Sequence, residues 1–427
     1  MRKVDLLRVV AARFLSRVGS EAAFFVGVWG KAAYVLDATP GDLAWLMLAL
    51  GVSLMIGSGV SGVLIDRYGP RAVLGVAEVI FVPAALAFIF ADSLLSLIAI
   101  ASVWALVGGP VMTAGASFAP YLTDDPAELK RANSLIEAGG SAAFVVGPAL
   151  GALIVRYTSV DWIFVIDAVT SLLAAIIIWH ARLSSTPARN RVGGGDSSTA
   201  RVGHPIRELI EGFKISYRMR ALRYYVLAGT VVWLSFGAFG VLEPLFFRDI
   251  VLADIEMLGW VNTMFGLGML LGALLLGRLG PRVISARGLA IFVSLNGLGA
   301  ALYIGTPDLR VIFAGALVWG LVIGALEPLL RTLIHRDAPH DAVGRVVSTS
   351  EVHRRGGELL PLAIAPALAA TIGIQATMIA GALLASVIAL LSLKEAAAID
   401  RKIGLRPLPR EGIAPLTPAE EPVSPLP

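Results

Sequence analysis

The sequence contains no cysteine among its 427 residues. Disulfide bonds, iron–sulfur clusters and thiolate-ligated metal ions are therefore excluded. Charge is also scarce: Asp, Glu, Lys and Arg make up 15% of the chain, against about 25% in a typical soluble domain. Hydrophobic residues account for 57%. This balance indicates an integral membrane protein in contact with the lipid bilayer.

Sequence patterns of catalysis and of nucleotide binding are missing as well. The chain has no His-Glu-x-x-His metal site, no Gly-x-x-x-x-Gly-Lys phosphate loop and no credible nucleophile–base pair. We therefore expect no enzyme, no ATP-driven pump, no metal site and no cofactor. The net charge of +4 does not predict nucleic-acid binding, because the basic residues are segregated into alternate loops, as membrane topology requires.

Apolar stretches recur along almost the whole chain. About twelve of them reach the ~20 residues that a helix needs to cross a bilayer. Only helices or closed barrels satisfy their backbone in lipid, and the alternating pattern of barrel strands is not visible. We predict an all-α integral membrane protein with twelve transmembrane helices near residues 11–36, 42–65, 72–92, 95–119, 131–156, 161–181, 223–247, 255–277, 286–306, 310–335, 345–371 and 374–393.

The basic residues of the loops lie almost entirely on one side of this topology. The loops of the opposite side hold only Arg156, Arg248 and Arg310. Cytoplasmic loops carry the excess of Lys and Arg. We therefore expect a multi-pass protein of the cell inner (plasma) membrane, with both termini cytoplasmic.

The chain also repeats itself. Several residues of the first half recur in the second half at a nearly constant offset, which is typical of a parallel duplication of six helices. The recurring pairs are Arg67 and Arg278, Trp104 and Trp319, Arg131 and Arg345, and Glu137 and Glu351.

The repeat and the composition of the joining segments predict four regions. A six-helix bundle occupies residues 1–182, and a second one occupies residues 223–394. Residues 183–222 form a cytoplasmic linker, polar and glycine-rich at first and then amphipathic, which predicts a helix on the membrane surface. Residues 395–427 are rich in proline near their end and are expected to form a disordered cytoplasmic tail.

A short motif joins the second and third predicted helices. It consists of Gly62, Asp66, Arg67, Gly69 and Arg71. A carboxylate at such a helix–loop junction can cap the N-terminus of a neighbouring helix, and an arginine can form an ion pair across an interface. Loop charge of the ordinary cytoplasmic kind explains the arginines but not the aspartate.

This motif resembles the loop 2–3 signature of the major facilitator superfamily of transporters. The resemblance implies two pseudo-symmetric six-helix bundles in the major facilitator fold, acting as a monomer. It also implies secondary active transport by alternating access. In that superfamily the loop closes the cytoplasmic side against the eleventh helix, so the resemblance assigns a gating role to these five residues.

A second motif lies in the fifth predicted helix, at Gly147, Pro148 and Gly151. It resembles the Gly-Pro motif of antiporters in the superfamily, although tight helix packing explains the same residues. Patterns around Arg131, Gly344 and 244–249 resemble the branch of bacterial macrolide, tetracycline-type and siderophore (enterobactin-exporter-like) efflux proteins. The resemblance therefore favours export over uptake.

Charged side chains inside predicted spans are the strongest site signal, because burying a charge in lipid costs several kcal/mol unless it serves a function. Glu21 lies four residues after Arg17 and can pair with it. We predict proton coupling at Glu21, Glu327, Glu358 and Glu243. A static network of ion pairs is the alternative. For Lys31, Glu78, Asp161 and Asp167 a structural role is preferred: Lys31 and Asp161 can reach the outer interface by snorkelling, and Asp167 can form hydrogen bonds within its own half.

Aromatic residues on the predicted first, fourth, seventh and tenth helices suit a substrate cavity for amphipathic compounds. We expect proton-coupled antiport that exports amphipathic small molecules, either drugs or siderophore-like compounds. An importer or flippase of an anionic solute or lysolipid is the alternative, with arginines of the eleventh helix binding its head group. The predicted cavity residues are Phe24, Phe25, Trp29, Trp104, Trp233, Phe236, Trp319 and Arg355.

Overall fold

The computed structural model describes residues 3–123, 125–182, 205–280, 282–339 and 342–403. Regular structure within these ranges is entirely helical. The first part of the predicted linker, up to residue 204, and the tail beyond residue 403 lie outside the described residues.

The first half of the chain forms one helical bundle. Its first helix, α1, continues through two π-helical segments, η1 and η2, and therefore spans more than its regular part. The elements are α1 (Lys3–Ala22), η1 (Ala23–Val28), η2 (Lys31–Val35), α2 (Pro40–Ala87), η3 (Phe88–Phe90), α3 (Leu94–Ala116), α4 (Ala119–Leu122), α5 (Pro126–Tyr157) and α6 (Asp161–Trp179).

α2 contains two of the predicted spans. Gly69 interrupts its helical backbone with a φ of 77°, a left-handed conformation that glycine adopts without steric cost. The spans predicted at 42–65 and 72–92 therefore meet at a sharp break. The helices turn back on each other at this glycine, which explains why the motif needs one there.

The second half forms a matching bundle with two additional short helices beside it. α7 (Pro205–Arg218) packs against α12 and α8, and α14 packs against α10. The elements of the bundle are α8 (Arg220–Phe246), η6 (Phe247–Val251), α9 (Glu256–Leu276), α10 (Ala286–Ile304), α11 (Leu309–Asp337), α12 (Val343–Ile372) and α13 (Ile374–Leu391), followed by α14 (Leu393–Ile403).

The predicted set of twelve transmembrane helices is confirmed. Nine helices of the described chain are long and apolar enough to cross a membrane, and α2 is one of them although it holds two spans. α1 and α12 complete the set; both carry several charged residues in their first halves, which lowers their hydrophobicity.

Two boundaries differ from the prediction. The first helix begins at Lys3 instead of near residue 11. The tail is helical as far as Ile403, so the disorder expected from residue 395 is wrong for 395–403. Asp400 accepts hydrogen bonds from the backbone N–H groups of Ala286 and Arg287, at 2.8 and 3.1 Å. This carboxylate caps the N-terminus of α10 and fixes α14 beneath the bundle.

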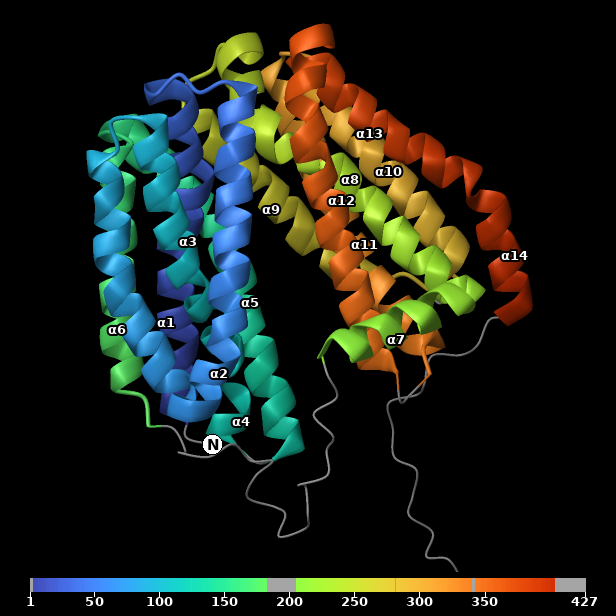
Figure 1. Ribbon diagram of the computed structural model, residues 1–427, viewed down its shortest axis with the longest axis horizontal. Coiled ribbons are helices and arrows are strands. Elements are labelled where there is room, and N and C mark those ends of the chain that lie inside the picture. The colour runs from blue at the N-terminus through green and yellow to red at the C-terminus, as the bar shows by residue number, and fades with distance from the viewer. Residues whose placement is uncertain (1–2, 124, 183–204, 281, 340–341, 404–427) are drawn as a thin grey trace, which may run out of the picture.

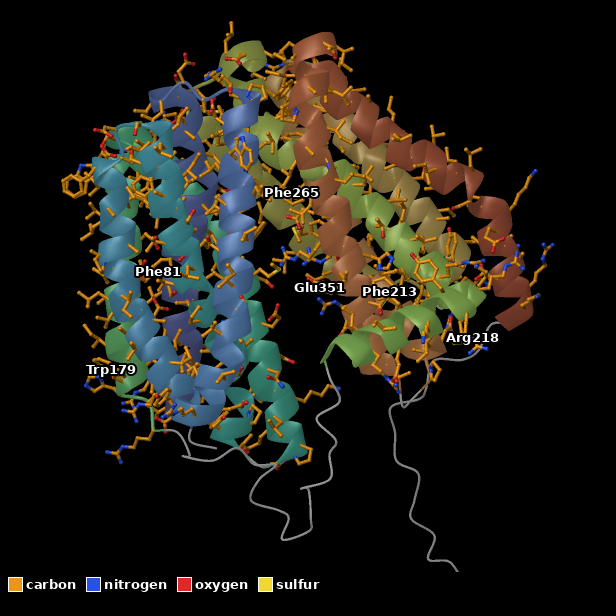
Figure 2. The ribbon with its side chains drawn as sticks, in the orientation of Figure 1. Phe81, Trp179, Phe213, Arg218, Phe265 and Glu351 are labelled. Carbon is orange, nitrogen blue, oxygen red and sulfur yellow. The ribbon has the colours of Figure 1, made fainter. Side chains whose placement is uncertain are left out.

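The two bundles lie side by side (Figure 1). We call the end with Lys3, Gly69 and α7 the inner end, after its expected orientation, and the opposite end the outer end. The ribbons converge at the outer end and diverge towards the inner end (Figure 1). Phe265 and Glu351 lie on the side of the second bundle that faces the first (Figure 2).

Candidate functional site

A cavity of about 300 Å³ lies between the two bundles. η1 with the adjoining Trp29, α2 and α5 contribute to it from the first bundle, and α8 to α12 contribute from the second. Ten of its 22 described lining residues are aromatic. The aromatic lining residues are Phe24, Phe25, Trp29, Phe144, Trp233, Phe236, Phe239, Phe265, Tyr303 and Trp319.

Trp319 is the centre of this aromatic wall. Its ring lies 4.7 Å from that of Phe239, 4.9 Å from that of Phe265 and 5.3 Å from that of Phe236, centroid to centroid. The indole N–H donates to Asn296 Oδ1 at 2.9 Å. A buried indole needs such an acceptor, and this bond fixes the orientation of the ring. The wall is therefore a rigid, preformed surface.

The structure places most of the predicted cavity residues in this lining: Phe24, Phe25, Trp29, Trp233, Phe236 and Trp319. Trp104 lies elsewhere, because its indole donates to Asp167 at 3.1 Å in the interior of the first bundle. Arg355 also lies outside the lining; its side chain is half-exposed and forms ion pairs with Glu351 and Glu358.

Sequence reasoning missed several lining residues. Phe239 follows Phe236 by three positions and shares its face of α8, so helical spacing could have identified it. Phe144, Phe265 and Tyr303 lie on the fifth, eighth and ninth spans. Their position at the cavity depends on how the bundles pack, and no local pattern indicates it.

Three predicted coupling carboxylates line the cavity: Glu243, Glu327 and Glu358. Its described lining includes no Lys, Arg or His. Glu243 accepts a hydrogen bond from the hydroxyl of Tyr303, and Glu327 accepts one from the indole N–H of Trp233 at 3.2 Å. The cavity is thus acidic as well as aromatic.

Arginines of α12 lie behind this lining. The guanidinium of Arg354 lies over the ring of Trp233, 4.6 Å from its centroid, and pairs with Glu351. Arg354 and Arg355 lie 3.8 and 3.4 Å from Glu358. These ion pairs connect the cavity carboxylate Glu358 to the inner end of the helix.

Glu21 lies outside the cavity lining, in the interface of α1 and α5. Arg17 donates to it at 2.8 Å, as the spacing predicts. A Cβ atom on Gly147 would lie 2.6 Å from the Cβ of Glu21 and 2.8 Å from the carbonyl oxygen of Val18. Gly147 is therefore required for the close approach of α5 to α1 beside this acid.

The rest of the antiporter-like motif also packs helices together. A Cβ on Gly151 would lie 2.9 Å from a methyl of Val26 on η1. On the other face of α5, Pro148 and Ala152 pack against Gly259 of α9. The motif thus forms a contact between the two bundles.

The loop motif contacts only its own bundle in this conformation. Asp66 is exposed and forms no hydrogen bond or ion pair with another described residue. Arg67 lies over the ring of Tyr68 at 5.3 Å, and Arg71 donates to the carbonyl oxygen of Trp179 at 2.5 Å. The expected closure against the eleventh helix, α12, is not formed here.

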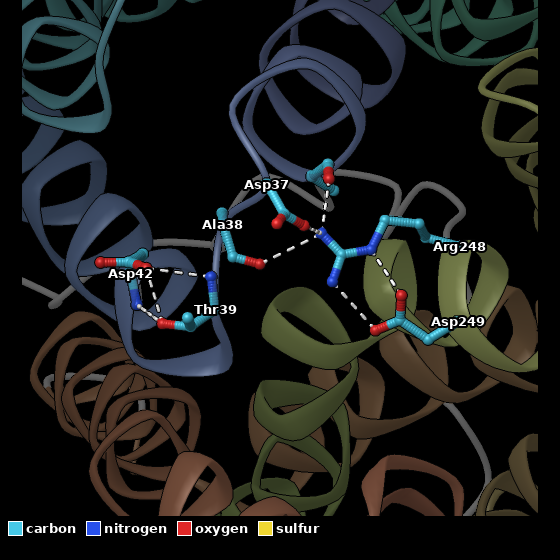
Figure 3. A network of polar contacts seen from close by, with 7 residues as sticks. Asp37, Ala38, Thr39, Asp42, Arg248 and Asp249 are labelled. Carbon is cyan, nitrogen blue, oxygen red and sulfur yellow. Dashed lines mark hydrogen bonds and ion pairs between the residues drawn. The ribbon is translucent and has the colours of Figure 1, made fainter.

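The outer end carries a polar network that sequence reasoning did not identify (Figure 3). Arg248 of η6 donates to three acceptors of the first bundle: the carbonyl oxygen of Ala33 at 2.6 Å, Asp37 Oδ1 at 2.8 Å and the carbonyl oxygen of Ala38 at 3.4 Å. Asp249 orients the guanidinium through two bonds of 2.5 and 3.0 Å. These contacts hold the two bundles together at the outer end.

Comparison with known proteins supports this architecture. The family profile described as Major Facilitator Superfamily matches residues 9–250 and 225–425. The uncharacterized MFS-type transporter YfiS of Bacillus subtilis (strain 168) is 23% identical, with coverage of 89% of this chain and 90% of that protein. The multidrug efflux pump Tap of Mycobacterium tuberculosis (strain ATCC 25618 / H37Rv) is 27% identical over 81% and 83% of the two chains.

Solved structures show the same fold. A mutant of the nucleoside transporter NupG superposes with a TM-score of 0.72 at 10% identity, over 92% of this chain and 99% of that one. The family match covers most of the sequence, and the twelve helices and the central cavity agree with it. The predicted resemblance is confirmed: the chain belongs to the Major Facilitator Superfamily and is a multi-pass membrane transporter.

Proposed function

We propose that this transporter exports amphipathic small molecules, drugs or siderophore-like compounds, in exchange for protons. The observation that carries the proposal is the central cavity, whose aromatic wall holds three carboxylates and no basic side chain among its described lining residues. Organic cations with a hydrophobic body fit this surface best.

Two forces select such compounds. A cation over an aromatic face gains about 0.5–2 kcal/mol, the larger value when water is excluded. A carboxylate in an apolar cavity has an unfavourable free energy that a bound cation relieves. Trp233 and Glu327 bring an aromatic ring and a carboxylate together in the cavity lining, where the indole N–H donates to the carboxylate.

The same carboxylates support proton coupling. Glu243, Glu327 and Glu358 can hold either a substrate cation or a proton, so the two ligands compete for one charge. Proton binding from outside then releases the substrate, and substrate binding from inside releases the proton. Glu21, paired with Arg17 beside the antiporter-like motif, is the fourth proposed coupling acid.

Alternating access is supported by the unequal contacts at the two ends. The outer ends are joined by Arg248 and by the hydroxyl of Tyr34, which donates to the carbonyl oxygen of Ala253 at 3.0 Å. The inner gating motif is not engaged with α12. We infer that the opposite state breaks the outer contacts and docks Asp66 and Arg71 against the second bundle.

The efflux direction is supported by the curated relative named as a multidrug efflux pump. We propose that the protein acts as a monomer in the plasma membrane with both termini cytoplasmic; the basic loops support this orientation. Uptake of an anionic solute or lysolipid is less well supported, because Arg355 lies outside the cavity and the acidic lining repels anions.

Transport of a lipophilic fluorescent cation in proteoliposomes tests the proposal. An imposed pH gradient should drive accumulation of the dye on the proton-rich side. Single Glu→Gln changes at Glu243, Glu327 and Glu358 should reduce the gradient-driven rate at least about tenfold, while Glu137→Gln on the exposed surface of α5 should not. Transport that is indifferent to the pH gradient would refute proton coupling.

A further inference from the structure

The first bundle encloses a second polar cluster, separate from the central cavity. Glu78 of α2 and Asp167 of α6 are 1% and 0% exposed. Arg13 of α1 lies near Glu78. Glu78 lies one helical turn before Phe81, and the label of Phe81 in Figure 2 shows where on the first bundle this cluster lies. None of these residues lines the cavity, and the proposed transport mechanism does not use them.

The charges of this region do not balance. Arg17 and Glu21 neutralise each other in their 2.8 Å ion pair. Among the described residues, Arg13 is then the one cation that interacts with Glu78, while Asp167 adds a second carboxylate near it. Glu137 on α5 also interacts with Arg13, but it is exposed to solvent and does not alter the count inside. A net charge of −1 in a membrane-embedded interior is strongly unfavourable unless a bound cation neutralises it.

Hydrogen bonding shows which carboxylate needs this cation. Asp167 accepts bonds from the indole N–H of Trp104 at 3.1 Å and from the hydroxyl of Ser20 at 3.3 Å. Both carboxylate oxygens of Glu78, by contrast, are buried without a hydrogen-bond donor among the described residues. A buried acceptor without any partner is rare and expensive in a native structure.

Arg13 does not supply the missing partner. Its Nη1 donates to the carbonyl oxygen of Met112 on α3 at 3.2 Å, and its Nε has no acceptor in the described structure. The hydroxyls of Ser16 and Ser171 face Glu78, but in this structure neither forms a hydrogen bond with its carboxylate. Ser171 Oγ also lacks a hydrogen-bond partner among the described residues, so neutral oxygen atoms surround an uncompensated carboxylate.

We propose that Glu78 binds one monovalent cation, a proton or a sodium ion, at a site enclosed between α1, α2 and α6. A single positive charge brings this interior to neutrality, whereas a divalent ion would leave an excess of +1. A proton on Glu78 would donate to the Ser16 or Ser171 hydroxyl. A sodium ion would instead take those hydroxyls and the carboxylate as oxygen ligands.

The site lies wholly within one bundle, so rocking of the bundles does not take it apart. Its cation therefore stabilises the first bundle in every transport state, unlike the cation exchanged at the central cavity. This inference does not depend on which compound is transported or on proton-driven export. A stability measurement tests it, and that measurement is unaffected by failure of the proposed function.

The experiment measures the Tm of purified, detergent-solubilised protein over a range of pH, in sodium chloride and in choline chloride at equal ionic strength. A cation bound only by the folded state raises the Tm by about 1–4 °C for each tenfold rise above its dissociation constant. If the ion is sodium, wild-type protein gains stability with sodium at high pH. If it is a proton, the Tm falls as pH rises through the range in which Glu78 loses its proton, independently of sodium.

Glu78→Gln should remove the response in either case, because its neutral amide needs no cation. Asp167→Asn removes the excess negative charge while keeping Glu78, so it should weaken the response as well. This second variant provides the test if Glu78→Gln does not fold. Asp92→Asn, at an exposed acid of the same bundle that does not contact the cluster, is the control and should behave as wild type. Parallel sodium and pH responses in wild type, Glu78→Gln and Asp167→Asn would overturn the proposal.

Discussion

Arg248 allows the proposed conformational switch to be tested quantitatively. Replacing it with methionine keeps an unbranched apolar stem and removes all the guanidinium donors. The lost contacts are the two backbone carbonyl oxygens of Ala33 and Ala38, at 2.6 and 3.4 Å, and the carboxylate of Asp37 at 2.8 Å. We expect Arg248→Met to shift the protein towards the state that is open at the outer end.

The magnitude follows from the environment of each contact. A hydrogen bond from a charged donor contributes about 1.5–3 kcal/mol, and Ala33 provides the shorter of the two backbone bonds. The pair with Asp37 adds only about 0.2–1 kcal/mol, because that carboxylate is 92% exposed. The total of about 2–4 kcal/mol corresponds to a shift of roughly 30- to 1,000-fold in the equilibrium between the two states.

Distance measurement between spin labels reads this equilibrium directly. The chain has no cysteine, so Leu95→Cys and Arg310→Cys, exposed at the outer ends of the two bundles, can be labelled without background. Arg248→Met should populate a longer distance, and Asp37→Asn should produce less than about a sixfold shift. The reasoning fails if Asp37→Asn matches Arg248→Met, or if Arg248→Met leaves the distances unchanged.

Three further changes test other parts of the molecule. Asp66→Asn should favour the conformation open at the inner end, because the opposite state loses its gating carboxylate; an unchanged distance between inner-end labels would indicate an ordinary loop aspartate. Gly147→Ala should lower the free energy of unfolding by about 1–3 kcal/mol through overpacking, since its Cβ would lie 2.6 Å from that of Glu21. The control Gly356→Ala meets nothing within 4 Å and should be neutral or stabilising by up to about 1 kcal/mol; equal thermal stability of the two variants contradicts the packing argument. Glu21→Gln should abolish pH-driven transport and leave substrate binding intact, and retained gradient-driven transport would exclude Glu21 as a coupling acid.

Much of the fold could be predicted because membrane insertion imposes a local rule. Each span must be long, apolar and helical whatever its neighbours are, so the helices could be located from the sequence. The prediction of disorder for residues 395–403 failed because α14 is held by a tertiary contact and not by its hydrophobicity. α14 is amphipathic and polar overall, and the contact of Asp400 with the N-terminus of α10 lies more than a hundred residues away along the chain. No local pattern reveals such a cap.

The candidate site was only partly predictable for the same reason. Phe24, Phe25 and Trp29 could be assigned because their helix lines the cavity throughout the superfamily. Trp104 is likewise an aromatic residue on a helix expected to line the cavity, but its indole donates to Asp167 inside the first bundle. The direction in which a side chain points depends on how its helix is rotated, and tertiary packing sets that rotation.

The sequence by itself determined the twelve helices, the duplication, the expected orientation and the motif at Gly69, since each follows from hydrophobicity, charge or backbone conformation over short distances. The tertiary structure alone decided which carboxylates meet at the cavity, that Arg248 joins the outer ends, and that Glu78 is left without a partner. Each of these features depends on contacts between segments that are distant in the sequence. Its energy is therefore set only when folding has buried the side chains and fixed their relative positions.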